Sequence, residues 1–106
     1  TDDYLKNNPK INEKITNILN QNDIQNFLKV YELFVNHKDK EEFLKIFSKT
    51  LVMTGEGDIG STPEMSKKLS KVIRNSNLKI VPKGKHLCSI ECPDDVNNEI
   101  KKHIDG

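Results

Sequence analysis

The chain has 106 residues, of which 34% are apolar and 31% charged. Even with its five glycines counted as apolar, the apolar share stays below the roughly 45–50% usual for a soluble domain. The chain can therefore form at most one small domain. The 17 basic and 16 acidic residues give a net charge of +1, which excludes the basic excess typical of nucleic-acid-binding proteins. No apolar run approaches the about 20 residues that a membrane span needs.

The start of the chain and its cysteines bear on where the protein works. The first residue is Thr1 rather than Met, and no charged-then-apolar signal sequence follows, so we expect a cytoplasmic segment of a longer protein. Cys88 and Cys92 are spaced C-x-x-x-C, which matches neither a redox pair nor half of a zinc site. Adding His86 and His103 produces no tetrahedral zinc spacing. We therefore expect free thiols, no metal and no cofactor.

Two amphipathic helices are predicted at the start of the chain. The first covers residues 8–20, with Asn8 as its cap and Pro9 as its first helical residue. The second covers residues 24–36, with Asp23 as its cap. In both, the apolar residues recur at helical spacing, which indicates one buried face.

A third helix is predicted from a capping-box pattern. Asp39 is followed three residues later by Glu42, and the segment carries Phe43 and Phe47. None of the three helices holds a set of residues that does chemistry. We interpret residues 1–49 as a helical segment that packs against another surface.

From Thr50 onward the pattern changes to that of an α/β fold. Residues 50–54 form a continuous apolar run ending at Gly55, which is typical of a buried parallel strand. Ser61 or Thr62 caps a helix that begins with Pro63, and its expected buried stripe is Met65, Leu69, Val72 and Ile73. A second strand at 78–81, a turn at 82–85 and a helix from Pro93 complete a βαβα unit with parallel strands.

Two parallel strands make an incomplete sheet. Such strands need helices on both faces and further strands at their edges. Three explanations stay open: the upstream helices cover the sheet, two copies of the chain share it, or its other strands lie in sequence outside this chain. We expect self-association through the unfinished sheet.

The loop after the first strand carries a glycine pattern. Gly55, Gly57 and Gly60 form G-x-G-x-x-G between a strand and a helix, which is the dinucleotide-binding fingerprint. The helix begins after the third glycine, however, and Lys83 stands near the place of the acidic ribose ligand. A nucleotide-binding module therefore stays a minor alternative, with Lys83 as a ligand for a 2′-phosphate.

A second pattern joins the loops that follow the two strands. Asp58 lies in the loop after the first strand and His86 in the loop after the second. Because neighbouring parallel strands run about 4.8 Å apart and end at the same edge, these side chains are within reach of a hydrogen bond. An acid that orients an imidazole is the arrangement used in nucleophilic catalysis.

Four segments of residues 50–105 resemble the C-terminal portion of an α/β-hydrolase. They are TLVMTGEGD at 50–58, TPEM at 62–65, IVPKGKHL at 80–87 and ECPDDVN at 91–97. The resemblance implies that Asp58 is the triad acid and His86 the general base. It also implies that residues 1–49 are a cap, or lid, and residues 50–106 the end of the core.

The chain lacks the third member of that triad. The family order is Ser, acid, His, but no G-x-S-x-G occurs in the sequence. We therefore expect this chain alone to be inactive and the complete protein to hydrolyse a small-molecule ester, lactone or related acyl compound. The main alternative is a non-catalytic helical interaction module, in which Asp58 and His86 are incidental.

Overall fold

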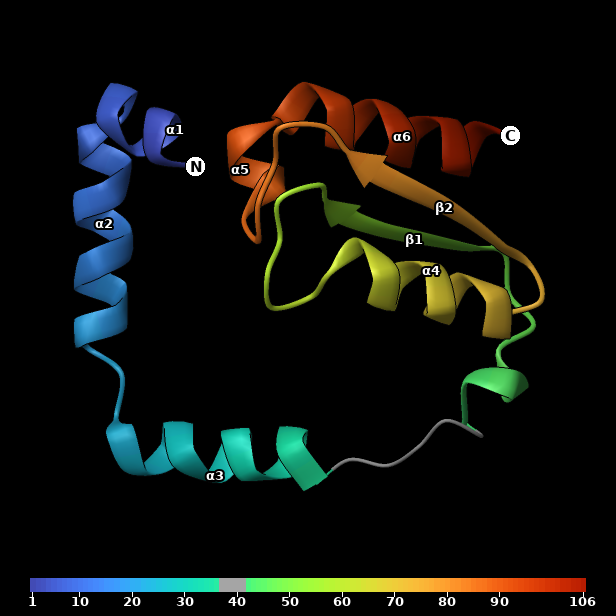
Figure 1. Cartoon of the computed structure of the whole chain (residues 1–106), viewed down its shortest axis with the longest axis horizontal. Coiled ribbons are helices and arrows are strands. Elements are labelled where there is room, and N and C mark those ends of the chain that lie inside the picture. The colour runs from blue at the N-terminus through green and yellow to red at the C-terminus, as the bar shows by residue number, and fades with distance from the viewer. Residues whose placement is uncertain (37–41) are drawn as a thin grey trace. The chain divides into compact units, whose positions relative to one another are not determined.

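The computed structural model describes residues 1–36 and 42–106 (Figure 1). Its elements are α1 (Asp2–Asn7), α2 (Pro9–Asn20), α3 (Ile24–Asn36), the 3-10 helix η1 (Glu42–Lys45), β1 (Thr50–Gly55), α4 (Pro63–Val72), β2 (Ser76–Val81), α5 (Cys88–Glu91) and α6 (Pro93–Asp105). The chain forms two compact units, residues 2–39 and residues 40–106 together with Thr1. None of the described helices is long and apolar enough to cross a membrane.

The helical unit contains the two predicted helices and one that was not predicted. Asp23 caps α3 as expected, because its Oδ1 accepts a hydrogen bond from the Asn26 N–H at 2.9 Å. Asn8 precedes α2 but does not cap it with its side chain. Its Nδ2 donates instead to the Tyr4 carbonyl at 2.9 Å, which ties the start of α2 to α1. With six residues, α1 is too short to produce a recognisable apolar period.

The predicted third helix is wrong in extent. Its expected cap, Asp39, lies outside the described residues, and the described part holds only the four-residue 3-10 helix η1. The Ile46 N–H donates to the Phe43 carbonyl, three residues back, at 3.3 Å, which is the spacing of a 3-10 turn. The chain must then extend to enter the sheet at Thr50, whose N–H donates to the Asn75 carbonyl at 2.8 Å. Strand pairing thus overrides the helical pattern.

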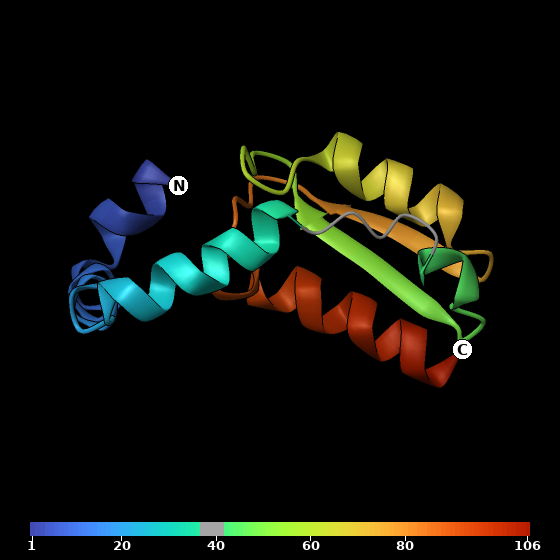
Figure 2. The same cartoon turned by 90° about the horizontal axis from the view of Figure 1, so that it is seen from below.

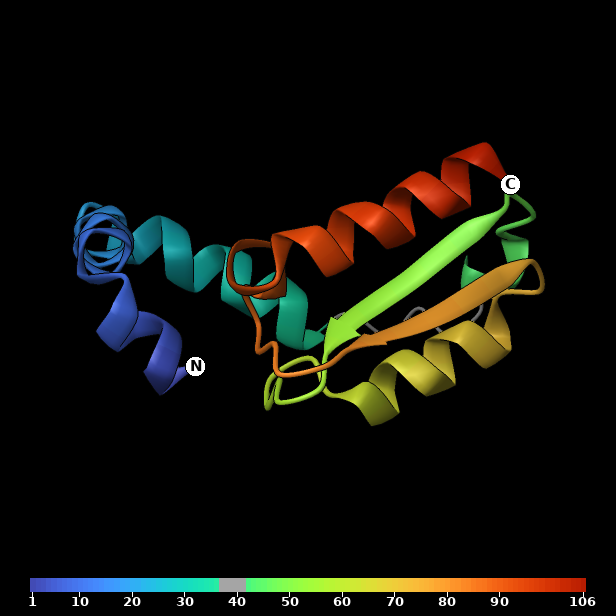
Figure 3. The same cartoon turned by 90° about the horizontal axis from the view of Figure 1, so that it is seen from above.

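The βαβ unit forms as predicted, with β1 and β2 parallel. Their register runs from Thr50 opposite Ser76 to Gly55 opposite Val81. β2 begins two residues earlier than the sequence pattern indicates, because the Ser76 hydroxyl is anchored to α4, where it donates to the Ser70 carbonyl at 2.7 Å. Both arrowheads in Figure 3 point to the same edge of the sheet, where the next two loops leave it.

The sheet lies between α4 on one face and α6 on the other (Figures 2 and 3). The buried apolar residues are Val52 on β1, Val81 on β2, Ile73 directly after α4, and Val96 on α6. The prediction for Met65 on α4 is wrong: its side chain was expected to be buried, but Met65 is 53% exposed and Ser66 is buried instead. The Thr62 hydroxyl caps α4 by accepting from the Met65 N–H at 3.3 Å, which sets the first turn so that Ser66 faces the sheet.

Candidate active site

The loops after β1 and β2 touch through their backbones. The Glu56 N–H donates to the Val81 carbonyl and the Gly57 N–H to the Gly84 carbonyl, both at 2.9 Å. A Cβ atom on Gly55 would lie 2.3 Å from the Lys85 carbonyl oxygen, closer than two such atoms can approach. Glycine at position 55 therefore lets the histidine-bearing loop lie directly against the end of β1.

Asp58 is buried and accepts three hydrogen bonds. Its Oδ1 accepts from the Gly60 and Ser61 N–H groups, each at 2.9 Å. Its Oδ2 lies 2.8 Å from Nδ1 of His86. The Asp58 side chain is 4% exposed. The structure thus brings together the two residues that the sequence indicated, one from each loop.

The hydrogen bonds keep Asp58 ionised. Burial raises the pKa of its carboxyl, but the hydrogen bonds from the Ser61 N–H, His86 and the Gly60 N–H together outweigh burial, so the pKa is lowered below its ordinary value of 3.8. An ionised carboxylate only accepts hydrogen bonds, so Nδ1 of His86 carries the shared proton. In a neutral imidazole, Nε2 is then the acceptor.

His86 is open to solvent although its partner is buried. Its side chain is 72% exposed, against 4% for Asp58. A shallow hollow adjoins the ring, and Ile59, which is 94% exposed, lies on its rim. The hollow is lined by Gly57, Asp58, Ile59, Gly60, Lys85 and His86. A base with one anchored nitrogen and an accessible ring can take a proton from a group that approaches through this opening.

Two acidic residues that the sequence analysis did not single out hold the turn before His86. In the predicted turn at 82–85, Lys83 has a φ of 61°, a left-handed conformation that favours glycine. The Lys83 N–H donates to Oε2 of Glu56 at 3.2 Å, and the Lys85 N–H donates to Oε2 of Glu91 at 2.7 Å. The Glu56 contact joins residues 27 positions apart and the Glu91 contact joins residues six positions apart, so no pattern within a single helix or strand indicates either of them.

The glycine loop has the wrong geometry for a dinucleotide. Its Gly57, Gly60 and Ser61 N–H groups donate to protein acceptors, and a phosphate would need such groups. The acceptor of the last two is the Asp58 carboxylate, which would repel a phosphate. Gly55 instead allows the close contact between the loops, and the N–H groups of Gly57 and Gly60 are already bonded within the protein.

The cysteines lie beside the histidine loop and are both free. Sγ of Cys92 contacts the Pro82 carbonyl at 3.7 Å. Burial raises the pKa of the Cys92 thiol, and the Glu91 and Asp95 carboxylates raise it further, so this cysteine is a protonated thiol rather than a nucleophile. In the part of the chain that the structure describes, no group of three or more His, Cys, Asp or Glu side chains could hold a metal ion.

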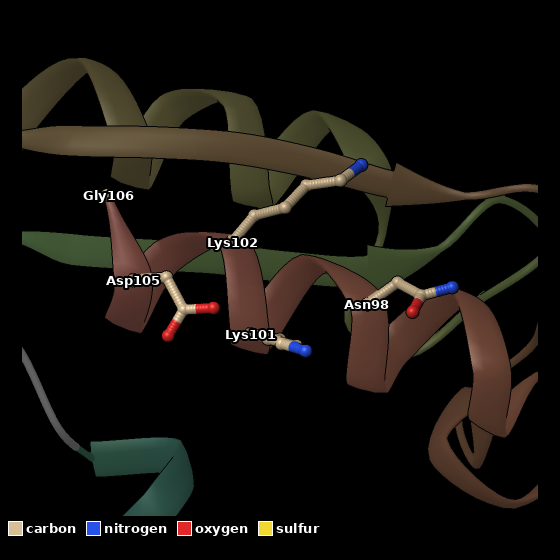
Figure 4. Close-up of a pocket in the computed structure, with 5 residues that line it drawn as sticks. All are labelled: Asn98, Lys101, Lys102, Asp105 and Gly106. Carbon is tan, nitrogen blue, oxygen red and sulfur yellow. The ribbon is translucent and has the colours of Figure 1, made fainter.

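A second hollow lies along the C-terminal half of α6. It is lined by Asn98, Lys101, Lys102, Asp105 and Gly106. Figure 4 shows Lys102 reaching across toward the strands while Asp105 points the other way. Lys102 is paired with Glu99 at 2.9 Å. Because these polar groups do not converge on one point, the hollow offers no arrangement for acid–base chemistry.

One of three comparisons with known proteins found a protein with a similar structure. No family model and no curated protein matches the chain. A solved structure described as a serine hydrolase involved in carbazole degradation, the CarC enzyme, is 29% identical over 64% of this chain, with a TM-score of 0.62. The shared fold is that of an α/β-hydrolase. This chain spans about a quarter, 26%, of that hydrolase's length, so it corresponds to a segment of the α/β-hydrolase fold.

Proposed function

We propose that this chain supplies the acid and the general base of a Ser-His-Asp hydrolase site, which in the complete protein cleaves small-molecule ester, lactone or related acyl bonds. The observation that carries the proposal is the 2.8 Å contact between Oδ2 of Asp58 and Nδ1 of His86. A non-catalytic interaction module would leave the two residues incidental, and nothing would then require a buried carboxylate aimed at an exposed imidazole.

The two residues have different tasks in this reaction. Nε2 of His86 takes the proton of a serine hydroxyl as it attacks the acyl carbon and later returns it to the leaving group. Asp58 holds the ring in the tautomer that leaves Nε2 free and stabilises the imidazolium as it forms. Water, deprotonated by the same nitrogen, releases the acyl intermediate. The 106 residues contain no G-x-S-x-G, so the serine must come from outside this sequence.

The proposal is tested by grafting residues 42–106 onto the carbazole-pathway serine hydrolase, in place of its corresponding segment. The graft is expected to hydrolyse a p-nitrophenyl ester, and His86→Ala is expected to lower kcat by about 10⁴-fold or more, because it removes the base. His103→Ala is the matched control, since His103 lies on α6 outside the site.

Equal activity of the parent graft and its His86→Ala variant would contradict this role. If the graft does not fold, proton NMR of the chain itself decides. A low-field Nδ1 proton of His86 that disappears in Asp58→Asn supports the pair, and its absence from the unmodified chain argues against it.

We further propose that the protein is cytoplasmic, where its two cysteines stay free thiols, and that it self-associates through the sheet. In the described residues the sheet has two strands, each paired along one edge only, and Leu78 on β2 is 37% exposed. Unpaired strand edges are templates for pairing with another chain. In sedimentation velocity, the apparent molecular mass is expected to increase with protein concentration. The increase should be smaller for Leu78→Lys, because a charged side chain on an edge strand opposes pairing with another strand. A monomer at all concentrations would contradict it.

A further inference from the structure

Glu91, the last residue of α5, carries a buried carboxylate that the acid–base pair does not use. Its side chain is 7% exposed. Oε2 accepts from the Lys85 N–H at 2.7 Å, and Oε1 contacts the amino group of Thr1. Burying a charged carboxylate costs free energy unless strong hydrogen bonds compensate for it. The bond to Lys85 is of the short, charge-assisted kind.

The position of this bond in the chain gives it a consequence for His86. Lys85 immediately precedes His86, so fixing its N–H fixes the backbone from which the imidazole projects. The same turn packs tightly on the other side, where a Cβ on Gly84 would lie 2.7 Å from the Cβ of Cys88. The carboxylate of Glu56 holds the same turn through a longer bond of 3.2 Å to the Lys83 N–H.

We infer that Glu91 is a positioning residue: its buried carboxylate holds the Lys85 peptide so that the His86 ring meets Asp58. This inference rests on the proposed function, because it assigns Glu91 a part in the same acid–base site. Glu91 acts through the backbone and touches neither reacting atom. Of the two carboxylates that hold the turn, Glu91 is the stronger, since it is buried and its bond is shorter.

Hydrogen exchange and proton NMR of the full chain test the inference. Glu91→Ala is expected to speed exchange of the Lys85 amide by about tenfold or more. Losing a hydrogen bond to a charged group should raise the population of the open, exchanging state by at least that factor. It is also expected to broaden or remove the low-field Nδ1 proton of His86. Glu91→Gln keeps an acceptor oxygen and should restore most of both signals. The control is Glu99→Gln, whose carboxylate pairs with Lys79 and Lys102 away from the loop.

Preserved exchange protection at Gly60 and Ser61 shows that the Asp58 turn is intact in each variant. Unchanged Lys85 exchange and an unchanged His86 signal in both Glu91 variants would overturn the inference. If Glu91→Ala does not fold, the smaller increase expected for Glu91→Gln, about threefold from the loss of charge assistance, decides alone. Absence of the low-field proton from the unmodified chain is a different result, which counts against the proposed function while Lys85 exchange still reports on Glu91.

Discussion

Asp58→Asn is expected to lower kcat of the grafted hydrolase by about 10⁴-fold, the loss typical of a triad acid changed to its amide. The asparagine keeps the size of the side chain and one acceptor oxygen for the Gly60 and Ser61 N–H groups. Its amide NH₂ then faces Nδ1 of His86, so the ring must accept there and carry its proton on Nε2. The nitrogen that should take the serine proton is then already protonated. Nitrogen-15 NMR of His86 in the chain itself checks the tautomer, and an unchanged tautomer would refute this account.

The same substitution is expected to change how stability depends on pH. Hydrogen bonds hold the pKa of folded Asp58 below its ordinary value of 3.8. A carboxyl with a lowered pKa in the folded state stabilises the protein at pH values above its unfolded pKa, and that stabilisation is lost as the pH falls through the folded pKa. Urea unfolding should show that the free energy of unfolding of the unmodified chain decreases between pH 7 and pH 2. In Asp58→Asn the decrease should be smaller, because the contribution of the Asp58 carboxylate is absent.

Asp105→Asn is the control for the pH series. Asp105 is an exposed carboxylate at the end of α6, outside the site. Asp105→Asn should leave the difference in the free energy of unfolding between neutral and acidic pH nearly as it is in the unmodified chain. If both variants lose the same part of the pH dependence, the hydrogen bonds to Asp58 are not its source.

Gly55→Ala is expected to lower the free energy of unfolding by about 3 kcal/mol, at the upper end for overpacking a tight contact. Its new methyl group would lie 2.3 Å from the Lys85 oxygen and 2.5 Å from the Gly84 oxygen. Both are backbone atoms that cannot move without opening the histidine loop, so the low-field His86 proton should be lost as well. Urea unfolding measures the first effect and proton NMR the second.

Gly60→Ala provides a matched control from the same glycine pattern. A Cβ on Gly60 would lie 3.7 Å from Oδ1 of Asp58, which is an ordinary contact, and none of the described non-terminal glycines needs a positive φ. Its effect should stay within about 0.5 kcal/mol. Equal destabilisation by the two substitutions would show that the close approach of the loops is not what Gly55 provides.

Where an element is set by its own residues, the sequence predicted it well. Asp23 and Thr62 cap their helices, Pro9, Pro63 and Pro93 begin theirs, and these signals act within one helical turn. Where the prediction was wrong, contacts with other segments of the chain are the reason. η1 is short because the chain must extend into β1, β2 begins early because Ser76 binds Ser70, and Ser66 rather than Met65 faces the sheet.

The candidate site divides in the same way. The sequence by itself determined the parallel βαβ unit and placed Asp58 and His86 in neighbouring loops, because parallel strands end at one edge of a sheet. Only the tertiary structure decided how the pair is held: the Gly60 and Ser61 N–H groups on Asp58, the contact allowed by Gly55, and the bond from Lys85 to Glu91. The hydrogen bonds within the Asp58 turn span only two and three residues, but the Gly55 contact joins the end of β1 to the histidine loop and the Lys85 bond joins that loop to α5. Because these contacts depend on how separate segments lie in space, residue patterns along the chain do not encode them individually.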